Sequence, residues 1–321
     1  MTSSAFDGLR ALPRVPLIDA PTPVARLQRF ERAIDSPYRI LIKRDDAIPF
    51  GFGGNKVRKL ELVLAKGVAD GADAVITCGG LQSNHCRATA AAAARLGLEC
   101  HLVLSGGQPL ATTGNTRLDE IFGARLHFVG GREERAPGME RVAEDLRERG
   151  LRPSIVPLGA STALGAAGFA LAVAELIDQG QQPDVIVHAS SSGGTQAGLL
   201  AGVALAELQS RVIGVSADES APALQGIIDG LTKGVLDLAG SIAAHRPAEV
   251  LDAFVGNGYG IPTDASRDAL SLLARSEAIV VDHTYTAKAL AGLVSLIRRR
   301  SLPQDSTILF WHTGGQIGVL A

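Results

Sequence analysis

The chain has 321 residues, of which few are aromatic, and its positive and negative charges nearly cancel. Aromatic residues make up 4% of the sequence, so a base-stacking platform or an aromatic-lined peptide groove is not expected. The 31 basic and 33 acidic residues leave a formal net charge of −2, which provides no general attraction to nucleic acid or to an anionic membrane. Hydrophobic residues make up 46%, too many for a disordered chain. These observations favour a folded protein with a small-molecule pocket.

The sequence also lacks a recognisable secretory signal, a disulfide framework and a membrane span. The first residues, MTSSAFDGLRALPR, contain no apolar stretch of the length that a signal needs. Three cysteines, Cys78, Cys86 and Cys100, lack the spacing of a zinc site, so we expect reduced, buried thiols in a cytoplasmic protein without a metal. The uncharged residues 155–174 contain Pro157 and are rich in Ala and Gly, which favours a loop and a buried helix over a membrane span.

Short apolar runs alternate with helical patterns along the chain, and this alternation predicts an α/β fold built from right-handed βαβ units. Several runs are apolar without alternation, so we predict open parallel sheets in three layers, with helices on both faces. The predicted strands are 39–43, 74–77, 101–104, 126–129, 154–156, 185–188, 212–215, 279–281 and 308–311. The predicted helices include 84–96, 139–148, 164–178, 195–208, 264–274 and 286–299.

Two segments rich in glycine or proline indicate how the chain divides into domains. Residues 49–54 are rich in glycine, and residues 151–159 contain proline and glycine. We therefore predict a small α/β domain, residues 52–160, inserted into a large domain made of residues 1–51 and 161–321. Ligands in such folds bind beyond the carboxyl ends of the strands, often between two domains, so the functional motifs should follow strands directly.

The segment KRDDAIPFGFGGNKVRKLE, residues 43–61, holds several of the few lysines. Only six lysines are present, and four of them fall within 24 residues. Lys56 follows a glycine-rich turn at the start of a predicted helix, with Asn55 as the expected N-cap. The positive end of the helix favours loss of its proton, which suits an amine that forms a Schiff base. An exposed loop lysine is the alternative, and Lys59 and Lys66 are interpreted as lysines on the solvent side of the helix.

Two further motifs place glycines and small polar residues between a strand and a helix. In GGLQSNHCRATA, Ser83, Asn84 and His85 open an Ala-rich helix, and simple N-capping by Ser83 or Asn84 is the alternative. In HASSSGGTQAG, residues 188–198, glycines and hydroxyls at a helix start predict an anion cradle of backbone N–H groups. The glycine spacing matches neither a dinucleotide fingerprint nor a P-loop, which favours a single small phosphate. A plain tight turn is the alternative.

Two tyrosines and a threonine lie at the ends of other predicted elements. Tyr285 falls at a strand-to-helix junction, Thr313 follows a strand and precedes two glycines, and Tyr259 lies in the turn NGYGIPT. Each residue alone is expected to be structural. Together the motifs describe one pocket with an imine-forming lysine, a cradle for one phosphate and hydroxyl groups at strand ends. This combination predicts pyridoxal 5'-phosphate (PLP) as the cofactor, with Lys56 as the imine lysine.

The order of these motifs resembles that of the D-cysteine desulfhydrase and 1-aminocyclopropane-1-carboxylate (ACC) deaminase family. The motifs are GFGGNKVRKLE, GGLQSNH, SSSGGTQAG, GYGIP, DHTYTAKAL and WHTGG, and the resemblance extends from about residue 15 to the end of the sequence. It implies a fold similar to that of the tryptophan synthase β-subunit group (PLP fold type II). It also implies that the large domain holds the cofactor and that the protein is a homodimer.

The resemblance implies a set of residues that bind the cofactor. Lys56 would hold PLP through an imine and relay the Cα proton. Asn84 would face the 3-hydroxyl group, and Thr313 would meet the pyridine nitrogen, where a neutral threonine fits elimination better than transamination. The residues that would bind the phosphate are Ser192, Gly193, Gly194 and Thr195.

The resemblance also implies the residues that face the substrate, which is a small amino acid. Ser83 and His85 would lie by its carboxylate next to Asn84, and Ser83 matches the position of the deaminase nucleophile. Tyr259 and Tyr285 would line the substrate side and take part in catalysis. Whether Ser83 or Lys56 handles the Cα proton is left open.

The predicted reaction is α,β-elimination from D-cysteine to pyruvate, hydrogen sulfide and ammonia, catalysed by a PLP-dependent carbon–sulfur lyase. In the deaminases a glutamate follows the second tyrosine, whereas Thr286 follows Tyr285 here, which resembles the desulfhydrases. The chain departs from the desulfhydrase pattern in GYGIPT, where an asparagine usually follows the proline. L-Cysteate sulfo-lyase and ACC deaminase therefore remain alternatives, so the enantiomer and the leaving group stay open. A non-catalytic PLP-binding or sensor protein is the alternative from another class.

Overall fold

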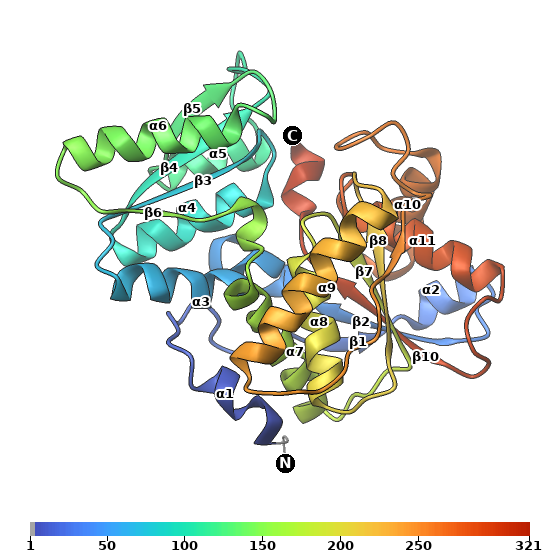
Figure 1. Cartoon of the computed structure of the whole chain (residues 1–321). Coiled ribbons are helices and arrows are strands. Elements are labelled where there is room, and N and C mark those ends of the chain that lie inside the picture. The colour runs from blue at the N-terminus through green and yellow to red at the C-terminus, as the bar shows by residue number, and fades with distance from the viewer. Residues whose placement is uncertain (1–3) are drawn as a thin grey trace.

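The computed structural model describes residues 4–321 and contains two β-sheets with helices on both faces (Figure 1). The larger sheet has six strands in the order β1-β2-β10-β7-β8-β9, and the smaller has four in the order β5-β4-β3-β6. Neighbouring strands are parallel, except that β1 pairs with β2 in the antiparallel direction at one edge. The predicted α/β fold is confirmed, with a short antiparallel edge strand as an addition.

The structural elements have the following bounds. The larger sheet contains β1 (Val24–Arg26), β2 (Arg39–Arg44), β7 (Val185–Ser190), β8 (Arg211–Ser216), β9 (Glu249–Leu251) and β10 (Thr307–His312). The smaller sheet contains β3 (Ala74–Gly80), β4 (Glu99–Ser105), β5 (Arg125–Val129) and β6 (Pro153–Ile155). The α-helices are α1 (Asp7–Arg10), α2 (Gln28–Ala33), α3 (Asn55–Ala69), α4 (Asn84–Leu96), α5 (Gly114–Ile121), α6 (Arg135–Glu148), α7 (Ala163–Asp178), α8 (Gly194–Leu205), α9 (Ala221–Leu238), α10 (Asp264–Glu277) and α11 (Thr286–Arg298). Short 3-10 helices cover Ser4–Phe6, Asp45–Ala47, Phe50–Phe52, Leu158–Ala160 and Gln316–Leu320.

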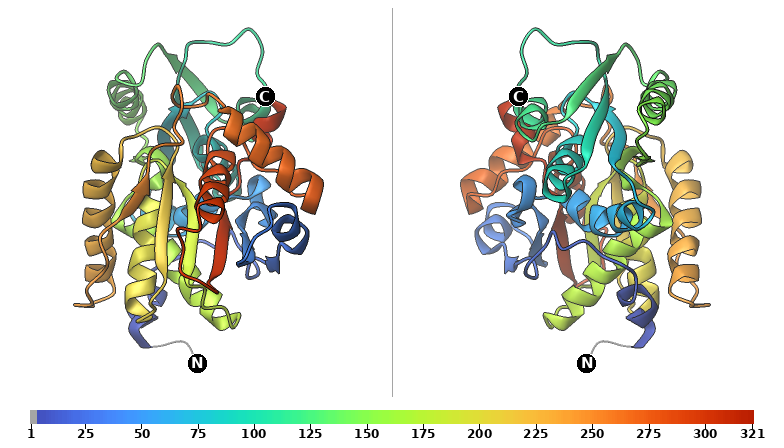
Figure 2. Two further views of the ribbon diagram at one scale, coloured as in Figure 1. Left: turned by 90° about the vertical axis from the view of Figure 1, so that its right-hand side faces the viewer. Right: turned by 90° about the vertical axis from the view of Figure 1, so that its left-hand side faces the viewer.

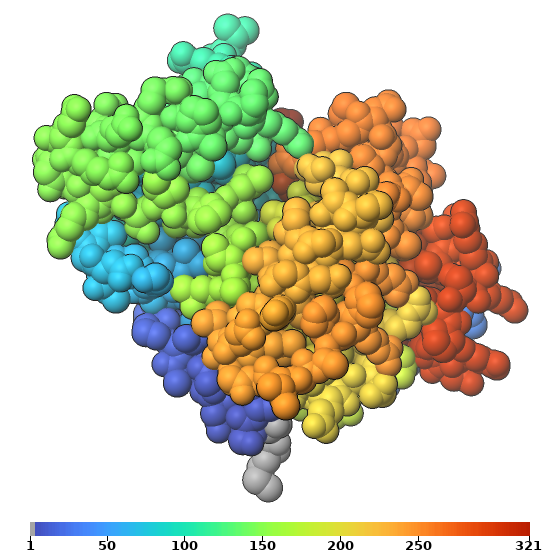
Figure 3. All heavy atoms as spheres, in the orientation of Figure 1, coloured from blue at the N-terminus to red at the C-terminus, as the bar shows by residue number. Residues whose placement is uncertain are grey.

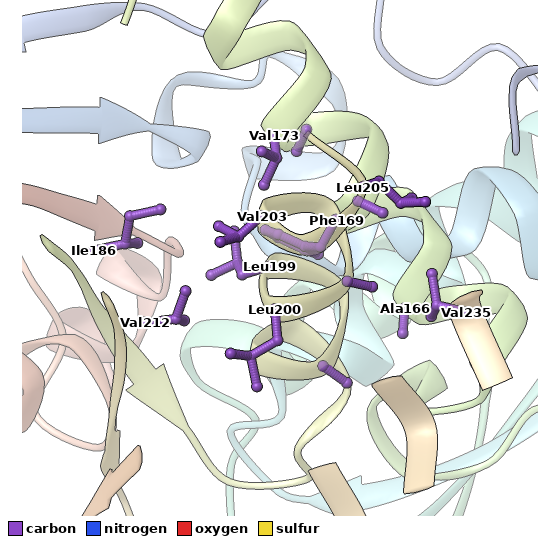
Figure 4. Close-up of a cluster of buried hydrophobic side chains, with 14 of the residues drawn as sticks. Ala166, Phe169, Val173, Ile186, Leu199, Leu200, Val203, Leu205, Val212 and Val235 are labelled. Atoms are coloured by element: carbon purple, nitrogen blue, oxygen red, sulfur yellow. The ribbon is translucent and has the colours of Figure 1, made fainter. Parts of the chain in front are cut away.

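The six-stranded sheet is buried on both faces, which explains the uninterrupted apolar runs of its strands. On one face Leu41 and Ile186 pack with residues of α7, α8 and α9. On the other face Ile40 and Val187 pack with residues of α2, α10 and α11. Figure 4 shows Leu199 of α8 inside the first of these clusters. We call this sheet and its helices the large lobe.

The four-stranded sheet forms the core of a second unit, which we call the small lobe. Leu102 packs with residues of α3 and α4 on one face, and Val103 packs with residues of α6 on the other. Figure 3 shows the cyan and green residues of this lobe as a mass beside the yellow to red residues of the large lobe, and Figure 2 shows the two lobes from the sides. The strands of the small lobe fall within residues 74–155, while the division into domains at residues 52 and 160 stays a prediction.

One predicted strand is wrong. Residues 279–281 pair with no strand in the described part of the chain, and the edge of the sheet is formed by β9, which the sequence pattern did not predict. The apolar side chains of Ile279 and Val281 are buried against α10 and α11. The carbonyl of Val280 accepts a hydrogen bond from His312 Nε2 at 3.0 Å. The apolar run 279–281 therefore belongs to a buried loop and not to a strand.

The interpretation of the cysteines and of the uncharged run agrees with the fold. Cys78, Cys86 and Cys100 are buried free thiols. Residues 155–174 form a loop that leads into the buried helix α7. No helix within residues 4–321 combines the length and the apolarity that a membrane crossing needs.

Candidate active site

A cavity of about 620 Å³ is lined by residues from both lobes, mostly from loops that follow the strands of the two sheets. The predicted site residues that line it are Lys56, Ser83, Asn84, His85, Ser192, Gly193, Thr195, Tyr259, Tyr285 and Thr313. Gly194 lies between two of these residues in the chain but does not form part of the wall. Motifs spread over 258 residues of sequence thus meet in one cavity, from Lys56 to Thr313.

Lys56 follows a turn with an unusual backbone. The φ angle is positive at four successive residues, 51–54, and rises from 53° to 102°. At Gly53 a Cβ would lie 2.7 Å from the carbonyl oxygen of Asp46, so only glycine fits there. The N-cap of α3 is Gly54, and the prediction that Asn55 caps this helix is wrong. Asn55 is already helical, and its side chain lies in the cavity wall between Thr195 and Lys56, with a hydrogen bond to each.

Arg87 of α4 holds this turn from the small lobe. Its guanidinium donates hydrogen bonds to the carbonyl oxygens of Gly51 and Gly53, the second at 3.1 Å. The side chain is only 1% exposed. The position of the turn that presents Lys56 therefore depends on a side chain of another helix.

The amine of Lys56 has a lowered basicity. Burial lowers the pKa of this amine to about 8, the charge of Arg87 adds to the effect, and Asp282 opposes it. The Nζ donates a hydrogen bond to Asn55 Oδ1 at 3.0 Å. A substantial fraction of the amine is therefore neutral near pH 8, and only the neutral amine can attack a carbonyl group. This geometry supports the prediction of Lys56 as the imine lysine.

The turn between β7 and α8 has the form of an anion cradle. Gly193 is the N-cap of α8 with a φ of 78°, and no side chain caps the helix, so its first N–H groups lack intrahelical partners. Ser192 Oγ shares a hydrogen bond of 2.7 Å with Ser161 Oγ. Thr195 Oγ1 accepts a hydrogen bond from Asn55 Nδ2 at 3.0 Å. These contacts fix the hydroxyl groups around the helix start.

Lys59 lies behind this cradle, and its predicted position on the solvent side of α3 is wrong. Its side chain is 1% exposed, and its Nζ donates to Gly159 O at 3.2 Å and Ser161 Oγ at 3.3 Å. A Cβ added at Gly194 would lie 2.9 Å from this Nζ. Burial and the neighbouring Lys56 lower the pKa of the Lys59 amine. The three-residue spacing from Lys56 places both lysines on one helix face, and this signal could have identified Lys59.

The start of α4 carries two predicted site residues with defined partners. Ser83 caps the helix, since its Oγ accepts a hydrogen bond from the backbone N–H of Cys86 at 3.2 Å. Asn84 Oδ1 accepts a hydrogen bond from Asn115 Nδ2 at 2.9 Å. The Nδ2 group of Asn84 is thereby left to donate on the cavity side. The capping role that the sequence offered as an alternative for Ser83 is confirmed, and Ser83 also lines the cavity.

The hydrogen bonds of His85 define its tautomer. Its Nε2 lies 2.8 Å from Thr77 Oγ1, and the Thr77 hydroxyl donates its only proton to the carbonyl of Val156 at 2.7 Å. Nε2 must therefore carry a proton and donate to Thr77, which leaves Nδ1 as a buried acceptor without a partner among the described residues. Burial, together with nearby Lys56, holds the pKa of His85 well below its usual value.

Tyr259 and Tyr285 meet through their hydroxyl groups. The two oxygens lie 2.5 Å apart, and the rings pack edge to face with centroids 5.7 Å apart. Burial raises the pKa of both hydroxyls, and Asp218 and Asp282 contribute to the increase. Both tyrosines are therefore protonated at neutral pH. One proton is used in the mutual hydrogen bond, and the other is available to the cavity.

Asp282 fixes the start of α11 beside these tyrosines. Its Oδ2 accepts hydrogen bonds from the backbone N–H groups of Thr284 and Tyr285, each at 2.9 Å. Its Oδ1 accepts from the backbone and the hydroxyl of Thr286, at 2.8 and 2.6 Å. The fully buried Thr286 side chain thus turns to Asp282 and does not line the cavity.

Thr313 follows β10 and lies next to the start of α3. Its carbonyl accepts a hydrogen bond from the backbone N–H of Asn55 at 2.9 Å. A Cβ on Gly314 would lie 2.6 Å from the Cα of Gly54, so two glycines allow the chains to touch. The Thr313 side chain is held in the wall beside Lys56 as a result.

Comparisons with known proteins agree with this arrangement. A family model described as pyridoxal-phosphate dependent enzyme matches residues 15–314. The crystal structure of an ACC deaminase homologue is 36% identical, with a TM-score of 0.93, and the match covers 100% of this chain and 97% of that chain. A fungal L-serine ammonia-lyase from Rhizomucor miehei is 20% identical, with a TM-score of 0.68 and coverage of 92% and 94%. Maize serine racemase is 18% identical, with a TM-score of 0.68 and coverage of 98% and 93%, and these two share the fold.

The residues of the cavity fit PLP. Lys56 would supply an amine for its aldehyde, and the uncapped start of α8, with Lys59 behind it, would supply donors for its phosphate. The buried hydroxyl of Ser190, beside the cradle, has no partner among the described residues, and Asn84 Nδ2 offers a donor to the ring. A dianionic phosphate would also neutralise the charge that burial disfavours on Lys59. The chain therefore belongs to the family of pyridoxal-phosphate-dependent enzymes, together with the ACC deaminase homologue, and PLP is its cofactor.

Proposed function

We propose that the protein catalyses α,β-elimination from a small amino acid that carries a leaving group on Cβ. The proposed substrate is D-cysteine, and the products are pyruvate, hydrogen sulfide and ammonia. PLP, when bound, supplies an electron sink for the bonds to Cα. The observation that carries the proposal is the buried amine of Lys56, with a pKa of about 8, in one cavity with a tyrosine hydroxyl pair.

Lys56 is proposed as the base that takes the Cα proton. The amine is neutral in part near pH 8, and a base with a pKa near the working pH is the most effective. Ser83 is less suited to this role, because its oxygen accepts the N–H of Cys86 and its proton has no base beside it in the described contacts. Ser83 is proposed to donate to the substrate.

The start of α4 is proposed to bind the substrate carboxylate. Helix N-termini carry a partial positive charge and free N–H groups, and Ser83 places a hydroxyl donor at the same point. Tyr259 and Tyr285 are proposed to line the opposite side of the substrate. Their spare proton can be donated to the group that leaves Cβ, because burial keeps both hydroxyls protonated.

The position of Thr286 supports elimination over ACC ring opening. The side chain is buried against Asp282 and offers no acidic group to the cavity, where the resemblance implies a glutamate in the deaminases. ACC deamination is therefore the weaker alternative. L-Cysteate stays an alternative because its sulfonate also leaves from Cβ.

A product screen with the purified, PLP-loaded enzyme tests the proposal. D- and L-cysteine, L-cysteate, β-chloroalanine, serine and ACC are assayed for pyruvate, with sulfide, sulfite and 2-oxobutyrate measured in parallel. Stoichiometric pyruvate and sulfide from D-cysteine are expected. 2-Oxobutyrate from ACC as the main product would contradict the proposal, and a yellow protein that converts none of these compounds would support the non-catalytic alternative.

A further inference from the structure

Arg135 is a cation on the cavity wall that no acidic side chain neutralises. It is the first residue of α6, and its Nε and Nη2 donate hydrogen bonds to Ser105 Oγ at 2.9 and 2.6 Å. Within residues 4–321 it forms no ion pair at 4.0 Å or less. Arg132, in contrast, pairs with Asp218 at 3.4 Å and lies 3.8 Å from Glu219. The two neighbouring arginines thus differ in whether their charge is compensated.

Ser105 holds Arg135 in place without neutralising it. The serine is 8% exposed at the end of β4, and its hydroxyl donates to the carbonyl of Gly79 at 3.5 Å. Its oxygen lone pairs are therefore available for the two guanidinium donors. A guanidinium keeps its proton under all ordinary conditions, so the site carries a permanent positive charge in a fixed orientation.

The guanidinium lies on the tyrosine side of the cavity. A Cβ added at Gly80 would stand 3.6 Å from Tyr259 Cε1 and 3.7 Å from Arg135 Nη2. Gly80 thus leaves a small space that the tyrosine ring and the arginine both border. Gly80 also precedes Ser83 by three residues, so this space is close to the proposed position of the substrate carboxylate.

The acids near this space face another cation. Asp218 and Glu219 are the acidic residues of the cavity wall, and the guanidinium of Arg132 lies between them and the ring of Tyr259, 4.9 Å from the ring centroid. Asp218 Oδ1 is buried without a hydrogen bond, yet its Oδ2 faces Arg132. Of the two arginines on the cavity wall, Arg135 is therefore the one whose charge is available to an anionic group of the ligand.

We propose that Arg135, fixed by Ser105, forms the leaving-group subsite and selects amino acids with an anionic sulfur substituent on Cβ, a thiolate or a sulfonate. The inference rests on the proposed function. The α-carboxylate and the cofactor phosphate already have places at the starts of α4 and α8, so Arg135 serves a third anion.

The chemistry of elimination requires such a group. The Cα proton passes to Lys56 Nζ, the Cβ–S bond breaks, and its electron pair goes to sulfur. A cysteine thiolate takes up the spare proton of the tyrosine pair as the bond breaks and departs as hydrosulfide, and the sulfonate of cysteate departs as sulfite. In both cases the departing group is an anion, and a fixed cation beside it stabilises the transition state.

Arg135→Gln tests the subsite, because glutamine keeps polarity and much of the length but loses the charge. We expect kcat/KM for D-cysteine and L-cysteate to fall about 100-fold. β-Chloroalanine has an uncharged substituent that leaves readily, so its conversion should change by less than about threefold. Arg135→Lys should recover part of the loss, and Arg147→Gln, at an exposed position of the same helix, is the matched control. The ratio of the cysteine and cysteate rates distinguishes a thiolate from a sulfonate preference.

An equal loss for all three substrates, or no loss for the sulfur substrates, would overturn the proposal. If the wild type converts no amino acid, the proposed function fails, and the subsite is then tested by binding alone. Calorimetric titration of the PLP-loaded protein with 3-sulfopropanoate, with propanoate as the control, should show at least tenfold weaker binding of the sulfonate to Arg135→Gln. Equal affinity of both proteins for 3-sulfopropanoate would refute the subsite.

Discussion

Two groups of buried and half-buried cations in the molecule differ in how their charge is balanced. In the first group, Lys43 of β2 and Arg58 of α3 form an ion network with Asp45 and Glu175, which contains equal numbers of positive and negative charges. Lys43 Nζ lies 2.5 Å from Glu175, and Arg58 donates to both carboxylates at 2.8 to 3.0 Å. In the second group, Lys56 and Arg135 on the cavity wall and Lys59 behind it have no carboxylate within 4.0 Å in the described part of the chain.

The difference separates structural from functional charge. A buried ion that is paired and hydrogen-bonded is stable, but it has few hydrogen-bonding positions left for a ligand. Asp45 is an example, because its Oδ2 also accepts a hydrogen bond from Trp311 Nε1 at 2.8 Å. A buried cation without an anion is unfavourable by itself and becomes favourable when an anionic ligand arrives. Lys43 and Lys59 lie only 16 residues apart, yet they belong to opposite groups.

The largest effect is expected from Lys56→Ala. Loss of the amine removes both the cofactor link and the proposed base, so turnover should fall by at least about 10⁴-fold. Borohydride treatment followed by mass spectrometry should show no reduced cofactor adduct on the variant. A retained adduct would show that the cofactor is linked to another lysine. The control is Lys66→Ala, which changes an exposed lysine of the same helix and should behave like the wild type.

Lys59→Gln should weaken PLP binding by about 10- to 100-fold, since it removes one charge-assisted contact to a phosphate. Fluorescence titration of the cofactor-free protein gives the dissociation constant. Pyridoxal, which lacks the phosphate, should bind to the variant and the wild type alike. A similar loss for pyridoxal would show that Lys59 acts through the shape of the site, and the contrast with the ion network would fail.

Glu175→Gln should leave cofactor binding unchanged and lower the free energy of unfolding by about 3 kcal/mol, because it leaves two buried cations with one acid. Urea denaturation of both proteins measures the difference. A variant that is as stable as the wild type but binds PLP poorly would show that Glu175 serves the cofactor site and not stability.

The same network predicts a loss of stability in acid. Burial alone would raise the pKa of Glu175, but Arg58 and Lys43 hold it at about 2, below its ordinary 4.5. The folded state therefore favours the ionised form, and this stabilisation is complete above pH 4.5 and declines as the pH falls towards 2. Thermal melts of Glu175→Gln across this range should show a smaller pH dependence than melts of the wild type.

The smallest effect is expected at the exposed pair of Lys66 and Asp70, 2.9 Å apart. Asp70→Asn should change the free energy of unfolding by about 0.5 kcal/mol or less, because water screens the pair. A change comparable to that of Glu175→Gln would show that burial does not decide the strength of ion pairs in this protein.

Local signals were sufficient for several elements and motifs. Helix α4 has the predicted bounds, Asn84–Leu96, because Ser83 caps its start and Gly97, with a φ of 70°, ends it. The motifs after β3 and β7 also lie in the cavity, each at the carboxyl edge of its own sheet, where ligands bind in folds of this kind.

Contacts between distant segments could not be predicted from one sequence. Glu175 lies 132 residues from Lys43, and no local pattern pairs them. Arg135 stands in the charged run GREERAPGMER, which is typical of a solvated helix start, and only the fold turns it to the cavity. The spacing of Lys59 from Lys56 predicts only a shared helix face, and its burial depends on the distant Gly159 and Ser161.

Arg87 of α4 holds the turn by which the chain crosses from β2 of the large lobe to α3 of the small lobe. The helix that carries Arg87 also carries Ser83 and Asn84 at its start, so one rigid element reaches both the lysine turn and the proposed substrate wall. Without the guanidinium of Arg87, the carbonyl groups of Gly51 and Gly53 would lose these donors, and the turn would lose its fixed position. One helix therefore sets the place of the nucleophile and that of the proposed substrate wall.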